Sequence, residues 1–193
     1  MISKKLALLG LVGAATIALG ACGADNDKKD SSASSSTMEM STAGSSETDV
    51  VSTASVSDDP AVLEEALSKD GNWIVAATKD VDFTKDVTVS GEFHDKGEDS
   101  GDIYRKLALY SQDADRNVTA EYTITVPTLT VESENFNIVH GTVKGDIVVK
   151  ANGFVLNGAK VEGNVTFEKQ EFQDSATLDE DGASVTGDVT VSE

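Results

Sequence analysis

The sequence predicts an all-β fold, a single-stranded parallel β-helix with a short capping helix at its N-terminal side. Two observations lead to this prediction. The phrase Val-x-Gly-Asp/Asn-apolar-x-apolar occurs three times, at residues 143–149, 161–167 and 185–191. Pairs of apolar residues separated by one polar or small residue also recur along the chain at intervals of roughly 20 residues. Such self-similarity is typical of folds in which each repeat buries its apolar face against its neighbours.

The amino terminus has the layout of a secretory signal. Lys4 and Lys5 precede an apolar run at residues 6–18, which is too short for a permanent membrane span of about 20 residues. The run ends in Leu-Gly-Ala-Cys at residues 19–22, and these four residues resemble the bacterial lipobox. The resemblance implies that residues 1–21 are a lipoprotein signal peptide and that Cys22 is the lipidation site. An ordinary signal peptide with an incidental cysteine is the alternative.

Cys22 is the only cysteine, so the sequence offers neither a disulfide nor a thiolate metal site as another role for it. Two or three acyl chains would hold the protein stably on a membrane, since each buried methylene contributes about 0.8 kcal/mol. We therefore expect a bacterial membrane protein that is lipid-anchored on the extracytoplasmic face.

Residues 22–57 are predicted to be a disordered tether. More than half of the residues from 31 to 57 are Ser or Thr, and no hydrophobic period runs through them. Residues 58–193 are then predicted to be the β-helix domain. The net charge of the whole chain is −19, which excludes nucleic acid as a partner because a polyanion is bound by clustered Lys and Arg.

The domain is predicted to open with a short amphipathic helix. Asp59 can cap its first amides, Pro60 suits its first position, and Gly71 is expected to end it. A stripe of apolar residues lies along one face: Val62, Leu63, Ala66 and Leu67. We expect this face to lie on the first turn of the β-helix.

A first strand is predicted at residues 72–77, and alternating apolar pairs follow. They are Val87/Val89, Leu107/Leu109, Leu129/Val131, Ile147/Val149, Val165/Phe167 and Val189/Val191. We align these pairs in one column that faces the core, with Phe136 and Ile138 placed like Phe154 and Leu156. In the last copy six extra residues bring Leu178 to the position of Phe154, so either that turn is looser or the insertion lies elsewhere.

The residues between the paired ones would face outward. They are Thr88, Ala108, Thr130, Val148, Thr166 and Thr190. Four of them, Thr88, Thr130, Thr166 and Thr190, form the candidate binding surface, a weakly polar ladder suited to an extended glycan or another protein.

The glycines of the repeated phrase, Gly145, Gly163 and Gly187, are expected at corners that need positive φ. The residues after them, Asp146, Asn164 and Asp188, should stack beside one another, and turn chemistry explains them better than a cation site does. Valines also recur every six residues from Val143 to Val161, as in a left-handed hexapeptide helix. A right-handed helix is favoured, with the left-handed one as the alternative.

The repeated phrase resembles that of bactofilins and related polymer-forming proteins, and the domain with its helix is similar to the pectin-lyase-like β-helix of bacterial surface lipoproteins. Lyases of that fold abstract a proton with Arg or Lys, often beside Ca²⁺-binding aspartates. Arg105 and Arg116 border acidic loops and could serve this role, but solvated surface loops are the favoured interpretation. His94 and His140 have no ligand-like spacing, so we expect no metal site, no cofactor and no catalytic residue.

The sequence therefore predicts a non-enzymatic cell-envelope lipoprotein that displays a β-helix surface for binding or assembly. The alternative is a carbohydrate-active protein, a glycan-binding module before a polysaccharide lyase. Its expected partners are the membrane through the lipid anchor, and self or cell-wall glycan. The last repeat has no covering helix after Val191, so its edge is expected to meet another copy or a partner.

Overall fold

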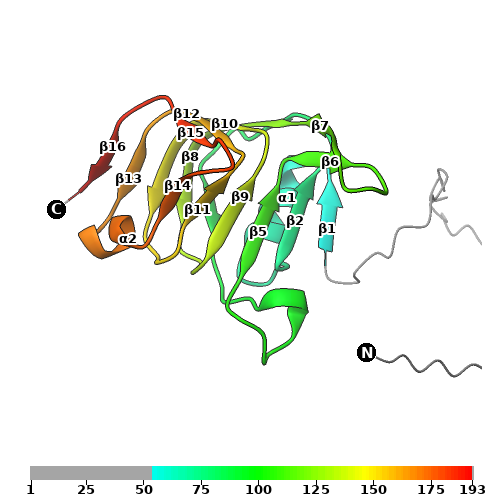
Figure 1. Cartoon of the computed structure of the whole chain (residues 1–193), viewed down its shortest axis with the longest axis horizontal. Helices are drawn as coiled ribbons and strands as arrows, with labels where there is room; N and C mark the ends of the chain where they lie inside the picture. The colour runs from blue at the N-terminus through cyan, green and yellow to red at the C-terminus, as the bar shows by residue number, and fades with distance from the viewer. Residues whose placement is uncertain (1–53, 193) are drawn as a thin grey trace, which may run out of the picture. The chain divides into compact units, whose positions relative to one another are not determined.

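The computed structural model describes residues 54–192, which belong to one compact unit (Figure 1). This part of the chain is mostly β, with two parallel sheets and a few short helices, as an all-β fold predicts. The predicted signal peptide and the first 32 residues of the predicted tether, Cys22 among them, lie outside the described residues.

The described chain begins with strand β1 (Ala54–Ser57), which pairs in parallel with β2 (Ile74–Ala77). Two kinds of contact hold this strand in place. Its backbone pairs with β2, and the Ser55 hydroxyl accepts a hydrogen bond from Asn72 Nδ2 at 2.6 Å. The prediction that residues 22–57 form a disordered tether is therefore wrong for its last four residues. A short run of Ser, Ala and Val reads as linker, but here it is paired against a neighbouring edge.

Helix α1 (Pro60–Leu67) confirms the predicted capping helix, because Asp59 Oδ1 accepts hydrogen bonds from the amides of Ala61 and Val62. Leu63, Ala66 and Leu67 are buried, whereas Val62 is 50% exposed. The helix ends at Leu67, and Gly71 lies in the following turn. Gly71 is required there for space, because a Cβ would overlap the carbonyl of Ala66.

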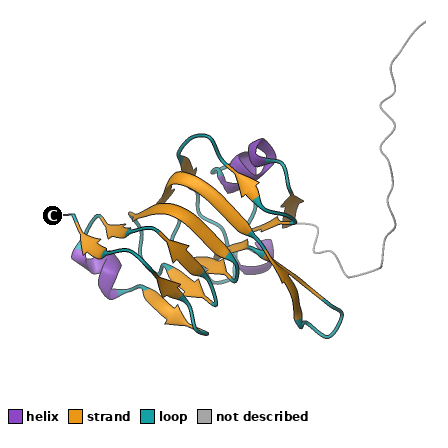
Figure 2. Ribbon diagram, turned by 90° about the horizontal axis from the view of Figure 1, so that it is seen from above, coloured by secondary structure: helices purple, strands orange, loops and turns teal. Residues whose placement is uncertain are grey.

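Two sheets carry the fold (Figures 1 and 2). The six-stranded sheet runs β1, β2, β5 (Arg105–Ala108), β9 (Phe136–Val139), β11 (Val155–Asn157) and β14 (Thr177–Glu180). The eight-stranded sheet contains β3 (Val81–Asp82), β4 (Val87–Val89), β8 (Thr123–Val131), β10 (Thr142–Val149), β12 (Lys160–Glu162), β13 (Val165–Phe167), β15 (Ser184–Val185) and β16 (Val189–Val191). All pairs within these sheets are parallel.

Each repeat supplies one strand to the six-stranded sheet and then two segments to the eight-stranded one. Strands β8 and β10 are long enough to supply both segments, and a register shift between Lys144 and Asp146 separates their two halves. In the middle of the fold the step between paired residues is 18 residues: Ile138 pairs with Leu156, Val143 with Val161, and Ile147 with Val165.

The core lies between the two sheets, where the inward residues of successive strands stack on one another. Leu129, Ile147 and Val165 in one row and Ile138 and Leu156 in another are at most 1% exposed. Val155 is only half-buried, while Phe154 and Leu156 beside it point inward. The six-residue period of the hexapeptide alternative therefore fails at this residue.

The predicted column of apolar pairs is confirmed for Val87, Leu129, Ile147, Val165 and Val189, which are joined in register. It is wrong for Leu107/Leu109 and hence for Ala108. Leu107 belongs to the six-stranded sheet, between Val75 and Ile138, and Ala108 is buried. Because of insertions in the early repeats, Leu107 and Leu109 lie roughly 20 residues from the neighbouring apolar pairs, which is the spacing expected for strands of the eight-stranded sheet.

The last repeat also differs from the predicted alignment. Val155 pairs with Thr177, which places Leu178 in the row of Leu156, and a register shift follows before Asn157 meets Glu180. Most of the extra residues lie before Thr177, where the chain forms helix α2 (Gln170–Asp174) beside the C-terminal end of the fold (Figures 1 and 2). Both interpretations kept open hold in part: most of the insertion lies before Thr177, and the register shift shows that the turn is also looser.

Two further insertions interrupt the early repeats. The first, at residues 92–104, includes the short 3₁₀ turn η1 (Asp95–Gly97) and a bridge between His94 and Ile103. The second is an antiparallel hairpin of β6 (Tyr110–Gln112) and β7 (Val118–Glu121). The hairpin connects Leu109 to Tyr122, and the amide of Tyr122 donates to the carbonyl of Leu109 at 2.8 Å.

Candidate functional site

The four threonines of the predicted surface lie in one straight row on the eight-stranded sheet. Thr88 is paired with Thr130, Thr130 with Val148, Val148 with Thr166, and Thr166 with Thr190. We call these five residues the threonine row. The structure thus brings together every residue predicted for the surface, with Val148 as the single apolar interruption.

The row is open to solvent because its side chains point away from the core. Thr88 and Thr190 at its ends are exposed, and the three central residues are half-buried by their neighbours. The hydroxyls of Thr166 and Thr190 lie 3.3 Å apart, within hydrogen-bonding distance. Their regular spacing makes the row a flat line of donors and acceptors along the stacking direction.

A ladder of acidic and amide side chains runs beside the threonine row. Asp146 Oδ1 accepts from the amide of Asn164 at 2.9 Å, and Asn164 Oδ1 accepts from the amide of Asp188 at 2.9 Å. This is the turn chemistry expected for the repeated phrase. Among residues 54–192, no group of three or more His, Cys, Asp and Glu side chains is placed to hold a metal ion.

Positive φ, predicted for the three glycines beside this ladder, is confirmed for one of them and wrong for the other two. Gly145 has φ of 137°, but Gly163 and Gly187 do not have positive φ. They are required because the stacked backbones approach closely: a Cβ on Gly163 would overlap the carbonyl of Gly145, and one on Gly187 would overlap that of Gly163. Their residue type follows from contact between repeats.

Arg105 is neither a surface residue nor placed to act on a substrate. Its side chain is 0% exposed, and all of its nitrogens donate to protein oxygens. The acceptors are the carbonyls of Asn72 (3.2 Å), Ala66 (2.8 Å), Ser68 (2.8 Å) and Ser90, and Ser133 Oγ (3.1 Å). The Phe93 ring also covers the guanidinium, with its centroid at 4.1 Å.

Burial lowers the pKa of Arg105 to about 10, so it remains charged at neutral pH. Two of its acceptors, the carbonyls of Ala66 and Ser68, lie at the C-terminal end of α1, where a positive charge is favourable. Both interpretations made from sequence, a catalytic base and a solvated loop residue, are therefore wrong for Arg105.

Arg116 lies in the exposed turn of the β6–β7 hairpin, with φ of 66°. Asp113 shapes this turn by accepting from the amides of Asp115 (3.0 Å) and Asn117 (2.9 Å). The hydrogen bond from the Asn117 side chain, together with these two backbone bonds, lowers the pKa of Asp113. The acidic loop beside Arg116 is thus a hydrogen-bonded turn.

The two histidines serve separate loops. His94 Nδ1 lies 2.8 Å from the carbonyl of Gly101 in the first insertion. His140 lies at the base of the hairpin, with Nδ1 3.3 Å from Glu121 Oε1 and its ring in edge contact with Tyr110. The two histidines therefore have different partners.

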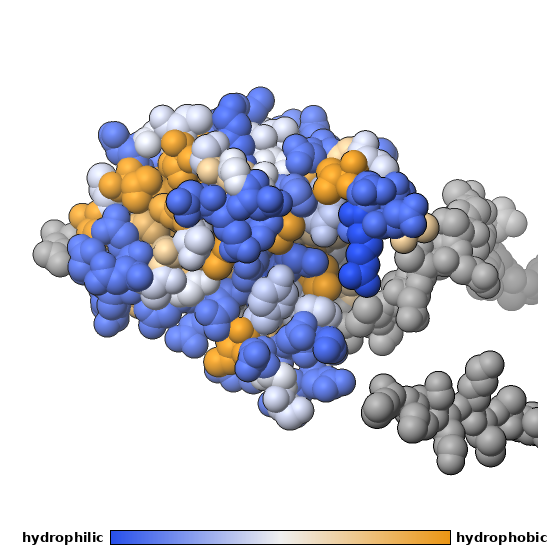
Figure 3. Space-filling view, in the orientation of Figure 1, coloured by the Kyte–Doolittle hydropathy of each residue, from blue (hydrophilic) through white to orange (hydrophobic). Residues whose placement is uncertain are grey.

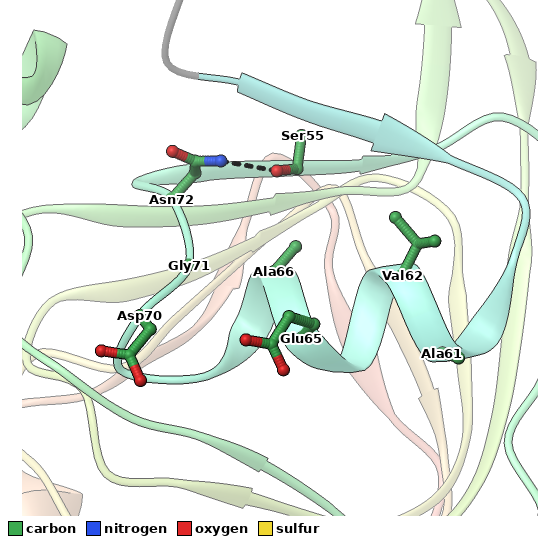
Figure 4. A pocket seen from close by; sticks show the side chains of 8 residues that line it. All are labelled: Ser55, Ala61, Val62, Glu65, Ala66, Asp70, Gly71 and Asn72. Atoms are coloured by element: carbon green, nitrogen blue, oxygen red, sulfur yellow. Dashed lines mark hydrogen bonds between the residues drawn. The ribbon is translucent and has the colours of Figure 1, made fainter.

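One pocket escaped the sequence-based prediction. It has a volume of about 420 Å³ and lies between β1 and α1, lined by Ser55, Ala61, Val62, Glu65, Ala66, Asp70, Gly71 and Asn72 (Figure 4). Val62 points toward it from the helix, which explains the exposure of that residue. The sequence did not predict this pocket because Val62, an apolar residue at the edge of the helical stripe, looks the same in sequence as a core residue.

No helix within residues 54–192 has the length and apolar character needed to cross a membrane. No protein-family model, curated protein or solved structure matches the chain.

Proposed function

We propose that this chain is a lipid-anchored protein of the bacterial cell envelope, in which a parallel β-helix presents the threonine row as a non-enzymatic binding surface. The anchor rests on the lipobox-like residues 19–22 and on Cys22 as the single cysteine. The surface rests on one observation, the register that places Thr88, Thr130, Thr166 and Thr190 in one line.

The β-helix is supported by the constant 18-residue step, which is the same in both sheets across the middle repeats. Each repeat contributes to one sheet and then to the other, with inward residues stacked in rows. A right-handed winding is favoured because connections between parallel strands almost always take that hand. In this fold α1 occupies the place of a strand segment over the first repeat.

Cell-wall glycan is the ligand that best fits the threonine row. Neighbouring strands lie about 4.8 Å apart, close to the length that one sugar ring adds to an extended polysaccharide. In each of the two pairs, Thr88 with Thr130 and Thr166 with Thr190, hydroxyls at that spacing can exchange hydrogen bonds with successive rings of a chain that runs along the row. The adjacent Asp146 and Asp188 disfavour a polyanionic glycan and leave neutral or amino sugars as the better match.

The test is binding of the full chain, kept in mild uncharged detergent, to purified cell-wall glycan in a pelleting assay. Replacing all four threonines of the surface by valine removes four hydroxyls and keeps the shape of each side chain. Each lost hydrogen bond costs about 1 kcal/mol, so affinity should fall by more than roughly tenfold.

The matched control is a quadruple Thr→Val variant at four exposed threonines outside the row: Thr84, Thr119, Thr125 and Thr177. It should bind like the parent chain. Equal binding by both variants would refute the threonine row as the site. Release of unsaturated uronates from pectin, alginate or hyaluronan, seen by their ultraviolet absorbance, would refute the non-enzymatic part of the proposal.

A further inference from the structure

The last repeat leaves its inward side chains partly uncovered. Leu178, Val185 and Val191 are only partly buried and Val189 is 40% exposed, although residues in the same rows one repeat earlier, Leu156, Val161, Phe167 and Val165, are 0% exposed. Figure 3 shows apolar surface among hydrophilic residues toward this end of the molecule. We call the surface formed by β14, β15 and β16 the open end.

The strands of the open end also keep one free edge each. Among the described residues, β14 pairs only with β11, β15 only with β12, and β16 only with β13. A free edge presents unpaired amides and carbonyls to an added strand, and this is the basis of strand-addition binding of extended peptides. Apolar side chains next to such an edge need apolar partners in the added strand.

The charged side chains within residues 170–192 of the open end are all acidic, although Lys160 and Lys169 lie on the neighbouring elements. Asp179, Glu180, Asp181 and Asp188 are exposed, and residues 170–192 contain no Lys, Arg or His. None of these four carboxylates forms an ion pair with a described basic residue. A segment added at this end would therefore face four carboxylates that are not neutralised by ion pairs with described basic residues.

This charge argues against a second copy as the occupant. Two open ends that face each other would bring two sets of carboxylates together. The opposite end of the fold, around α1, carries Asp59, Glu65 and Asp70, and of these Asp70 is paired with Lys69. Like charges placed across an interface oppose association, whereas a basic segment is attracted.

We propose that the free edge of β14 binds an extended basic segment of another protein, which adds a strand to the six-stranded sheet. Leu178 points toward the core, so the residue beside it in the added strand should be apolar. Thr177 and Asp179 flank it on the outer face, where cross-strand neighbours of opposite charge are favourable. The partner segment should thus alternate apolar and basic residues.

The probe is a fluorescent, blocked peptide that alternates lysine and valine, titrated against the full chain in uncharged detergent and followed by anisotropy. We expect saturable binding that weakens as salt is raised, because exposed charges are screened. Peptides with glutamate in place of lysine, or with N-methylated valines that cannot pair, should not bind. Binding of either control peptide would overturn the proposal.

Two variants of equal charge change locate the site. Neutralising the rim with D179N, E180Q and D181N together should reduce affinity by roughly tenfold or more. The control combines E98Q, D99N and D102N in the exposed first insertion and should leave affinity unchanged. An equal loss in both would show general attraction to an acidic protein and would refute a site at β14.

Hydrogen exchange supplies a measurement that needs no substitution. Peptide binding should slow amide exchange in β14 after Thr177, because the added strand occupies the free edge there, whereas the amide of Thr177 already donates to the carbonyl of Phe154 at 2.9 Å. Slower exchange at Ala54–Ser57 instead would place the peptide at the other edge of the same sheet. A dimer that forms with rising protein concentration and protects β14 without peptide would assign the edge to a second copy.

Discussion

Arg105 carries a positive charge into the interior without an acidic partner. Its guanidinium is held by four carbonyls and one hydroxyl, which come from the end of α1, the turn before β2, the end of β4 and the segment before β9. These oxygens need donors where water cannot reach them. The side chain therefore joins the capping helix to the first repeats through polar bonds, where the rest of the core is apolar.

Replacing Arg105 by methionine should destabilise the protein strongly. It fills similar volume but leaves several buried carbonyls unsatisfied, so we expect the free energy of unfolding to fall by about 3–5 kcal/mol. Lysine restores the charge with fewer donors and should recover part of this loss. The measurement is urea unfolding of the full chain in mild detergent.

The control for this substitution is Arg116→Met, which changes charge equally at an exposed hairpin turn. It should alter the free energy of unfolding by less than about 0.5 kcal/mol. Similar stability of the Arg105 and Arg116 variants would show that the buried bonds contribute little.

Among the predicted residues, those of the threonine row were placed correctly and Arg105 was not. The row follows from alternation within a strand and a constant step between strands, both of which are local properties of the sequence. Burial of Arg105 depends on carbonyls from segments up to 39 residues away. A charged residue beside acidic loops looks exposed unless those distant contacts are known.

At the level of the elements, the predicted alignment of strands is correct where the repeats have no insertions and fails where they have them. From β9 to β13 the step is 18 residues and the predicted alignment holds. Earlier, the loop at residues 92–104 and the β6–β7 hairpin lengthen the repeats, so Leu107 and Leu109 were assigned to the wrong sheet. A periodic signal identifies the strands, but it does not show which sheet they join once the period is broken.

The β6–β7 hairpin should be removable. Its strand β7 is exposed throughout, and Leu109 and Tyr122 already meet through a hydrogen bond at its base. Joining Leu109 directly to Tyr122 leaves the same number of residues between the two sheets as in the next repeat, where His140 and Gly141 fill this place.

We expect the variant that lacks residues 110–121 to fold with a free energy of unfolding within about 1 kcal/mol of the parent, because only surface contacts such as His140 with Glu121 are lost. Circular dichroism and urea unfolding measure this. Failure to fold would mean that the hairpin contributes to the core of the early repeats.

For the whole molecule, anchoring and binding are proposed for separate parts of the chain. Cys22 would hold the protein at the membrane, and the described residues would carry the surfaces. Substituting Cys22→Ser should move the protein from the detergent phase to the aqueous phase in a phase-partition experiment on cells that express it. The reason is the loss of acyl chains, each methylene of which contributes about 0.8 kcal/mol to membrane binding.

Partitioning of the Cys22→Ser protein with the membrane fraction would contradict lipid anchoring as the means of attachment. The substitution lies outside the described domain, so binding to cell-wall glycan should be unchanged. That comparison separates the two halves of the proposed function.

The constant step between β9 and β13 makes the molecule extendable. Residues 142–159 form one complete repeat, because Thr142 at its start is paired in register with Lys160, the first residue of the next repeat. A tandem duplication of these 18 residues would insert one complete layer and lengthen the stack by about 4.8 Å. The length of the fold can thus be increased in steps of one repeat, while α1 at one end and α2 at the other stay unchanged.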